Sequence, residues 1–170
     1  MNFLFREPNG PFEEGLREFT DTNCDVNFKT PDWKGVARFF ELIEMSFDIV
    51  SASDCNGNEV GKPFAKHASK VGLNNFVLVE CWDGKDLVTR LQIFLEVEED
   101  GSPFIELTFF PGGIAQNDNF RQRFVDWIDR IGSALRAETI FVRHENGAWD
   151  FGDTSRYSGV LIHATRQEHL

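Results

Sequence analysis

Basic residues are scarce in this sequence. Of its 170 residues, 17 are Lys or Arg and 28 are Asp or Glu, which gives a formal net charge of −11. Proteins that bind nucleic acid displace counterions with Lys and Arg, and anionic membranes are also attracted to basic patches. The composition therefore argues against direct binding to nucleic acid or membrane, and it favours a basic protein as the partner.

Cysteines are also few, and they lie far apart. Cys24, Cys55 and Cys81 are odd in number and form no CxxC pair, so the sequence contains neither a disulfide framework nor a metal-binding knuckle. Free thiols in a reducing compartment are the simplest interpretation. No recognisable metal-ligand spacing is formed by the polar residues near a predicted turn, which are His144, Glu145, Asp150 and Asp153. We therefore expect no metal and no cofactor.

Long apolar runs are absent as well. The first apolar segment, residues 3–5, is much shorter than the core of a secretory signal, and no segment approaches the ~20 apolar residues of a transmembrane helix. From these absences we expect a cytoplasmic protein.

What the sequence does contain is enough apolar material to fold. Apolar residues make up 41% of the chain and aromatic residues 14%, with 18 phenylalanines. Disordered chains are poor in aromatic residues, because they cannot bury enough apolar area to offset the entropy of ordering. At this length we expect a single domain over residues 1–170.

Two amphipathic helices are predicted. Thr30-Pro31-Asp32 is typical of a helix start, with Thr as cap, and apolar residues then recur every three or four positions to about residue 45. A second helix is expected to start at Asn117 or Asp118 and to run to about Ala137.

Strands are predicted from alternation and from turn residues. A three-stranded antiparallel meander is expected over residues 76–82, 87–98 and 104–110, with turns at Asp83-Gly84 and at residues 100–102. Further strands are expected at residues 1–6, 47–53, 139–143, 148–151 and 158–165, and Asn56-Gly57 favours a type I′ turn. The predicted fold class is α+β: a mostly antiparallel sheet with a central three-stranded meander, and two main helices packed on one face.

Two short elements, His67-Ala68-Ser69 and His163-Ala164-Thr165, resemble the signature of the two-histidine phosphoesterase superfamily. The resemblance implies that His67 and His163 exchange protons with a phosphodiester and that Ser69 and Thr165 help to hold the phosphate. Imidazole suits this role because it can accept or donate a proton near neutral pH. The alternative is two unrelated histidines in or near strands, because such short motifs also match by chance.

An acidic run, Glu96, Glu98, Glu99 and Asp100, lies at the end of the long central strand and in its turn. Carboxylates held by a rigid hairpin would steer a basic partner, although the same residues could simply keep a strand edge soluble. Three phenylalanines on the face opposite the Leu and Ile side chains could contribute aromatic contacts beside this run, or could be covered by a helix: Phe94, Phe104 and Phe110.

The sequence leaves three functions open. The leading hypothesis is a protein-binding domain, most plausibly an inhibitor or immunity-type protein that occludes a basic surface such as a toxin or nuclease active site. The second is a small phosphodiesterase that uses His67, Ser69, His163 and Thr165. The third is a structural or adaptor domain that forms a homo-oligomer.

Overall fold

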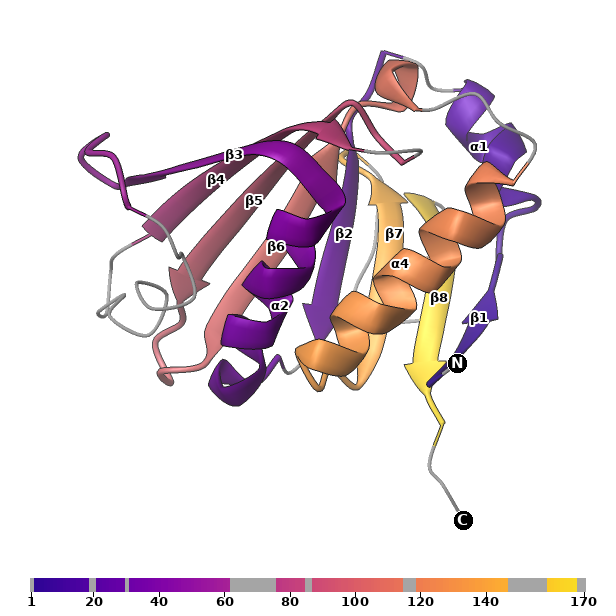
Figure 1. Cartoon of the computed structure of the whole chain (residues 1–170). Helices are drawn as coiled ribbons and strands as arrows, with labels where there is room; N and C mark the ends of the chain where they lie inside the picture. Colours follow the sequence, from indigo (N-terminus) through magenta and orange to yellow (C-terminus); the bar gives the residue numbers. More distant parts are fainter. Residues whose placement is uncertain are drawn as a thin grey trace.

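Eight antiparallel strands form one sheet in the computed structural model of the chain (Figure 1). The structure describes residues 2–18, 21–29, 31–61, 76–84, 87–114, 119–146 and 159–167. The strands are β1 (Phe3–Arg6), β2 (Cys24–Lys29), β3 (Phe47–Asp54), β4 (Phe76–Gly84), β5 (Arg90–Val97), β6 (Pro103–Phe109), β7 (Thr139–His144) and β8 (Val160–Arg166).

The order of the strands across the sheet is β1-β8-β7-β2-β6-β5-β4-β3, and each pair of neighbours is antiparallel. The α+β class is confirmed. The predicted meander is present as β4, β5 and β6, but it is only part of the sheet and lies in one half of it. The predicted strand at residues 148–151 lies outside the described residues.

Helices α2 (Trp33–Ser46) and α4 (Phe120–Ala134) lie side by side over one face of the sheet (Figure 1). A short helix, α1 (Phe12–Glu18), lies near the start of α4, and a 3-10 turn, η1 (Pro111–Gly113), follows β6. No helix among the described residues is long and apolar enough to span a bilayer.

The core lies between the two long helices and the sheet. Phe39 and Ile43 of α2, Ile128 of α4, and Leu91 and Ile93 of β5 are each fully buried. Alternation along a strand sends successive side chains to opposite faces. We therefore call the face that carries Leu91 and Ile93 the helix-covered face, and the opposite face the outer face.

The cap of helix α2 lies two residues later than predicted. The prediction of Thr30 as cap was wrong: Asp32 is extended, with φ −111° and ψ 131°, and its side chain accepts a hydrogen bond from the backbone N–H of Lys34. A carboxylate at this position satisfies a free N–H and complements the helix dipole. Helix α4 is preceded by Asn119, and the predicted caps at 117 and 118 lie outside the described residues.

Two of the three predicted turns differ from expectation. A type I′ turn needs positive φ at both central residues, but at Asn56-Gly57 only Gly57 has it, with φ 77°, because the turn closes through the Gly57 N–H to the Asp54 carbonyl. Asp83-Gly84 is not a hairpin turn, since β4 continues through Gly84, which pairs with Phe47 of β3. The turn before Ser102 is confirmed, with φ 83° at Gly101.

Candidate partner-binding face

The outer face of β4, β5 and β6 carries a partly exposed mixture of polar, acidic and aromatic side chains. Phe94 lies between Leu78 of β4 and Glu106 of β6, and the next cross-strand row places Gln92 between Glu80 and Thr108. All six are partly buried rather than enclosed. The prediction that Phe94 and Phe104 face away from the Leu and Ile side chains is confirmed, and neither α2 nor α4 lies on this side.

A buried polar cluster occupies the middle of the same face, where β2 and β7 continue the sheet. Asp25, Asn27 and Arg143 are each less than 10% exposed. The Arg143 guanidinium contacts Oδ2 of Asp25 at 3.0 Å, and its Nε donates to the Asn27 side-chain oxygen at 2.9 Å. The Asn27 amide donates to Glu106 at 2.6 Å, and the Thr108 hydroxyl donates to Asp25 at 2.8 Å. Because buried polar groups are stable only when they are hydrogen-bonded, the cluster fixes the register of three strands.

Burial raises the pKa of Asp25 from 3.8 to about 6. The hydrogen bond from Thr108 and the charge of Arg143 oppose that increase in pKa, while the carboxylates of Glu106 and Glu145 add to it. The largest effect is desolvation, which disfavours the charged form of a carboxyl group. The cluster therefore contains a carboxyl group whose pKa lies well above the ordinary value of an aspartate.

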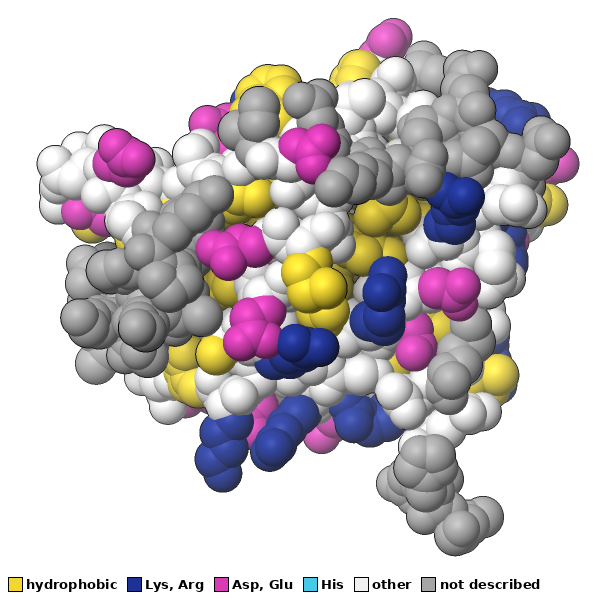
Figure 2. Space-filling view, viewed as in Figure 1, with side chains coloured by type: hydrophobic (Ala, Val, Ile, Leu, Met, Phe, Trp, Pro, Cys, Tyr) yellow, Lys and Arg dark blue, Asp and Glu magenta, His cyan; other side chains and the backbone are white. Residues whose placement is uncertain are grey.

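Acidic residues are concentrated in the half of the sheet that contains β3 to β6. Residues 47–61, 76–84 and 87–109 contain ten Asp or Glu but only one Arg and no Lys. The lysines of the intervening segments lie outside the described residues: Lys62, Lys66, Lys70 and Lys85. By contrast, Figure 2 shows Lys and Arg side chains over α4 and along the lower edge of the helix-covered face.

The acidic residues singled out from the sequence lie at one end of this half. Glu96, Glu98, Glu99 and Asp100 are all exposed. Glu96 lies on the outer face opposite Phe104, and the other three form the turn between β5 and β6. The turn is rigid: Gly101 donates its N–H to the Glu98 carbonyl, and the Trp33 indole donates to the Gly101 carbonyl at 2.7 Å.

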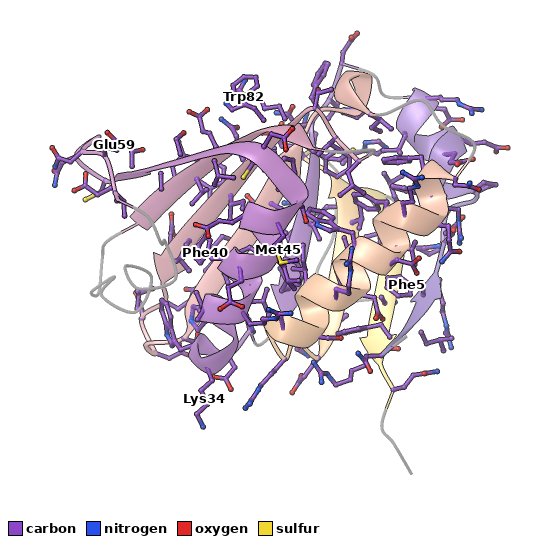
Figure 3. All side chains as sticks on the ribbon, in the orientation of Figure 1. Phe5, Lys34, Phe40, Met45, Glu59 and Trp82 are labelled. Atoms are coloured by element: carbon purple, nitrogen blue, oxygen red, sulfur yellow. The ribbon has the colours of Figure 1, made fainter. Side chains whose placement is uncertain are left out.

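A shallow hollow of about 210 Å³ opens beside this face between β3 and β4. Glu59 and Glu80 are the acidic residues of its lining, and Leu78 is the largest apolar one. The labelled Glu59 lies at the far end of the β3 turn in Figure 3. A basic side chain would find carboxylates and an apolar surface together here.

Two exposed aromatic residues lie at the other end of the face. Trp82 is 39% exposed and Phe110 is 45% exposed. The sequence does not identify them as a pair: its pattern assigns Trp82 only to a strand, and it groups Phe110 only with Phe94 and Phe104. Their closeness follows from the strand register, which the sequence does not specify.

The histidine elements are described only in part. His67 and Ser69 lie outside the described residues, so their distance from His163 stays untested. His163 lies on β8, with its ring stacked on Phe141 at 4.7 Å between centroids and 5° between planes, and Thr165 is exposed two residues later. Burial, and to a lesser extent the charge of Arg6, lowers the pKa of His163.

The residues considered for a metal site are likewise only partly described. Asp150 and Asp153 lie outside the described residues. His144 is buried, with Nδ1 3.7 Å from the sulfur of Cys24, and burial lowers its pKa. Burial also raises the pKa of the Cys24 thiol to about 12. Among the residues that the structure describes, no three His, Cys, Asp or Glu side chains are grouped as metal ligands.

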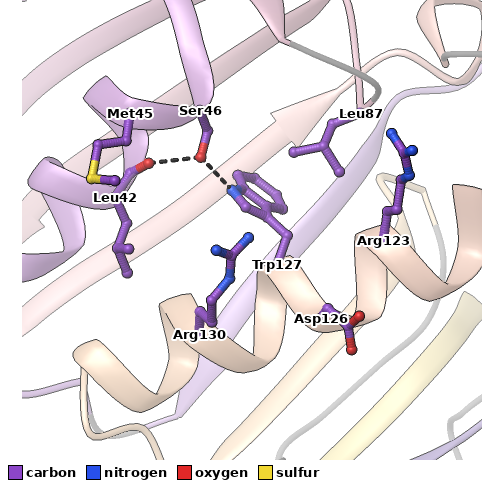
Figure 4. Close-up of a pocket in the computed structure, with 8 residues that line it drawn as sticks. All are labelled: Leu42, Met45, Ser46, Leu87, Arg123, Asp126, Trp127 and Arg130. Carbon is purple, nitrogen blue, oxygen red and sulfur yellow. Dashed lines mark hydrogen bonds between the residues drawn. The ribbon is translucent and has the colours of Figure 1, made fainter.

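A groove of about 420 Å³ lies between α2 and α4, on the helix side of the molecule (Figure 4). The Trp127 indole donates to the Ser46 hydroxyl at 3.1 Å, and that hydroxyl donates to the Leu42 carbonyl at 2.7 Å. Met45 on α2 and Arg130 on α4 line its two sides. The polar atoms at its floor are thus used in holding the two helices together.

Comparison with known proteins gives a likeness of fold. No family model matches the chain, and a search of curated proteins finds no match. The chain is similar to a chain in a crystal structure of the toxic C-terminal tip of CdiA from Pseudomonas aeruginosa in complex with an immune protein. The TM-score is 0.59 at 12% sequence identity, and the match covers 88% of this chain and 98% of that chain. At this identity the likeness establishes the fold alone.

Proposed function

We propose that this chain is an immunity-type protein that binds a toxin domain through the outer face of β3 to β6. The observation that carries the proposal is the charge of the described part of this half of the sheet, residues 47–61, 76–84 and 87–109, where ten Asp or Glu accompany one Arg. The fold it shares with a chain of a toxin–immune protein complex supports the same proposal.

The expected partner has a basic surface. Complementary charge raises the rate of association and excludes wrong partners more than it adds affinity. A toxin whose active site binds nucleic acid or another polyanion carries such a surface, because Lys and Arg neutralise phosphates. Occupation of that surface by an acidic sheet face would block access of the substrate.

The test is protection of a bacterial host. A tagged chain is used to capture its partner from source cells, and the captured protein is then expressed in a host with and without this chain. We expect the partner alone to stop growth and coexpression to restore it. A captured protein that is harmless, or whose toxicity is unchanged by coexpression, would contradict the proposal.

The charge of the face is tested with two matched variants. Combined Glu98→Lys, Glu99→Lys and Asp100→Lys should slow association with the toxin by at least about tenfold at low salt, with a smaller effect at high salt. Combined Glu13→Lys, Glu14→Lys and Glu138→Lys changes the net charge equally, but away from β3 to β6. An equal fall in the association rate of both variants would show that the overall charge of the protein, and not this face, attracts the partner.

A further inference from the structure

Trp82, Arg90 and Phe110 form a continuous row across three neighbouring strands at one end of the outer face. Trp82 pairs directly with Arg90 in the register of β4 and β5. In the register of β5 and β6, Leu91 pairs with Phe109, so one further step brings Phe110 opposite Arg90. Residues that face each other on neighbouring strands have Cβ atoms about 5 Å apart. We call these three residues the aromatic row.

The aromatic row brings together two of the strongly exposed large hydrophobic side chains among the described residues. Four large hydrophobic side chains are strongly exposed among the described residues: Leu4, Met45, Trp82 and Phe110. Leu4 lies on β1 at the opposite edge of the sheet and Met45 lies on α2, so of the four only Trp82 and Phe110 share one end of the outer face, on either side of Arg90. Figure 3 shows Trp82 projecting from the end of the sheet, away from Met45.

Each member of the row is held in place by the protein itself. The Arg90 guanidinium lies 4.7 Å from the centre of the Trp82 ring and donates to Glu80 at 2.9 Å. The Phe110 ring lies against Gly112, where an added Cβ would come within 2.8 Å of the ring. Side chains fixed before binding lose little entropy when they enter a partner, which favours tight contact.

We infer that the aromatic row is the main source of affinity for the partner, and that the partner offers an apolar cleft edged by Lys or Arg. This inference rests on the proposed function. Trp, Tyr and Arg dominate the binding energy of interfaces, whereas exposed charges mainly set the rate of association. Glu80, next to the row, is paired with Arg90, but the described residues of β3 to β6 as a whole are acidic, which favours a partner with a basic rim.

The geometry allows one partner to cover both ends of the face. The row lies at the start of β5 and the acidic turn at its end, roughly 25 Å apart for eight residues at about 3.3 Å each. An interface of standard size buries about 800 Å² on each partner, which is wide enough to include both. The row then holds the partner that the acidic turn has attracted.

The closing experiment begins with a photo-crosslinker in the full chain, expressed in source cells. p-Benzoylphenylalanine is placed at Phe110 in one variant and at Met45, on the helix-covered face, in the other. We expect the toxin to be crosslinked from position 110 and not from position 45. Crosslinking from position 45 alone would overturn the inference but leave the proposed function intact.

The crosslinked toxin is then purified and its affinity measured by calorimetry. Trp82→Ala and Phe110→Ala should each weaken binding by at least about 30-fold, mainly through faster dissociation, whereas Met45→Ala should change it less than about threefold. Unchanged affinity in both aromatic variants would refute the role of the aromatic row but would leave the proposed function intact. No binding by the unmodified chain would refute the proposed function as well.

Discussion

Arg143 and Asp25 form an ion pair in the middle of the outer face, with 3.0 Å between Nη2 of the arginine and Oδ2 of the aspartate. Both side chains are less than 10% exposed. Despite this cation, the pKa of Asp25 is raised to about 6, because desolvation outweighs the attraction of Arg143. The carboxyl group therefore binds its proton more tightly in the folded chain than in the unfolded chain.

This shift predicts that Asp25 makes the protein less stable as the pH rises. The unfolded state loses this proton near pH 3.8 and the folded state only near pH 6, so the contribution of Asp25 to the free energy of unfolding should fall across that range and be gone above about pH 7. Between about pH 5 and pH 7.5 the fall should be about 1 kcal/mol after allowance for solvent screening. Urea unfolding at several pH values measures the change. The matched variant is Asp25→Asn, which cannot titrate.

The difference between wild type and Asp25→Asn isolates this carboxyl group. His144 and His163 have lowered pKa values, so their contributions to stability grow as the pH rises through their ordinary range, the opposite direction. Those contributions are common to both proteins and cancel in the difference. A difference that does not vary with pH would show that Asp25 is already ionised at pH 5.

His163 offers a second titration prediction. Its half-buried ring stacks on Phe141 and lies opposite Arg6 in the strand register, so its NMR titration midpoint should lie below 6.5. Arg6→Gln should raise the midpoint by removing a like charge. A midpoint at or above 6.5 in the wild type would contradict this placement of the ring.

The same residue tests the phosphodiesterase alternative. If His163 transfers a proton to or from a cyclic phosphodiester, the wild type should turn over such a compound and His163→Ala should abolish turnover. Turnover that is absent in the wild type, or unchanged in the variant, would exclude that function. The prediction of a site shared with His67 depends on residues outside the described part of the chain.

Local sequence predicted the elements whose own pattern is strong, and missed those that depend on neighbours. β5 alternates clearly, and both long helices carry an apolar stripe, so their existence was correctly predicted. β2 was missed, although Cys24, Val26 and Phe28 alternate with polar residues. It is only six residues long and follows a broken segment, and it becomes a strand because β6 and β7 pair with it on both sides.

The candidate site was predictable only where its residues are adjacent in the sequence. Glu98, Glu99 and Asp100 form a visible run, and they are exposed as expected. The aromatic row joins Trp82 and Phe110, 28 positions apart, through a register that periodicity does not determine. The predicted hairpin turn at Asp83-Gly84 was wrong for the same reason, because pairing of β4 with β3 overrides the local preference for a turn.

Gly35 packs α2 directly against the backbone at the end of α4. A Cβ added at this position would overlap the backbone carbonyl oxygen of Ala134 and lie 2.8 Å from Cα of Leu135. Since backbone atoms cannot turn aside as a side chain can, Gly35→Ala should lower the free energy of unfolding by about 3 kcal/mol. Gly61→Ala, where an added Cβ meets nothing within 4 Å, is the control and should be nearly neutral. Equal stability of the two variants in urea would mean that the helices can separate without cost.

Arg136 ends α4 in a conformation that suits glycine. Its φ is 57°, and the Ala137 N–H bonds to the Gly132 carbonyl while the Arg136 N–H bonds to that of Ser133, as in a Schellman motif. The left-handed conformation costs a non-glycine residue about 1–2 kcal/mol, which exceeds the value of the exposed ion pair that Arg136 makes with Asp32 at 3.4 Å.

Arg136→Gly should therefore raise the free energy of unfolding by about 0.5–1 kcal/mol, whereas Arg136→Ala, which keeps the strain and loses the ion pair, should not. High salt screens the ion pair and should widen the advantage of the glycine variant over the wild type. If glycine and alanine are equally destabilising in thermal unfolding, the ion pair outweighs the backbone strain and this account of the helix end is wrong.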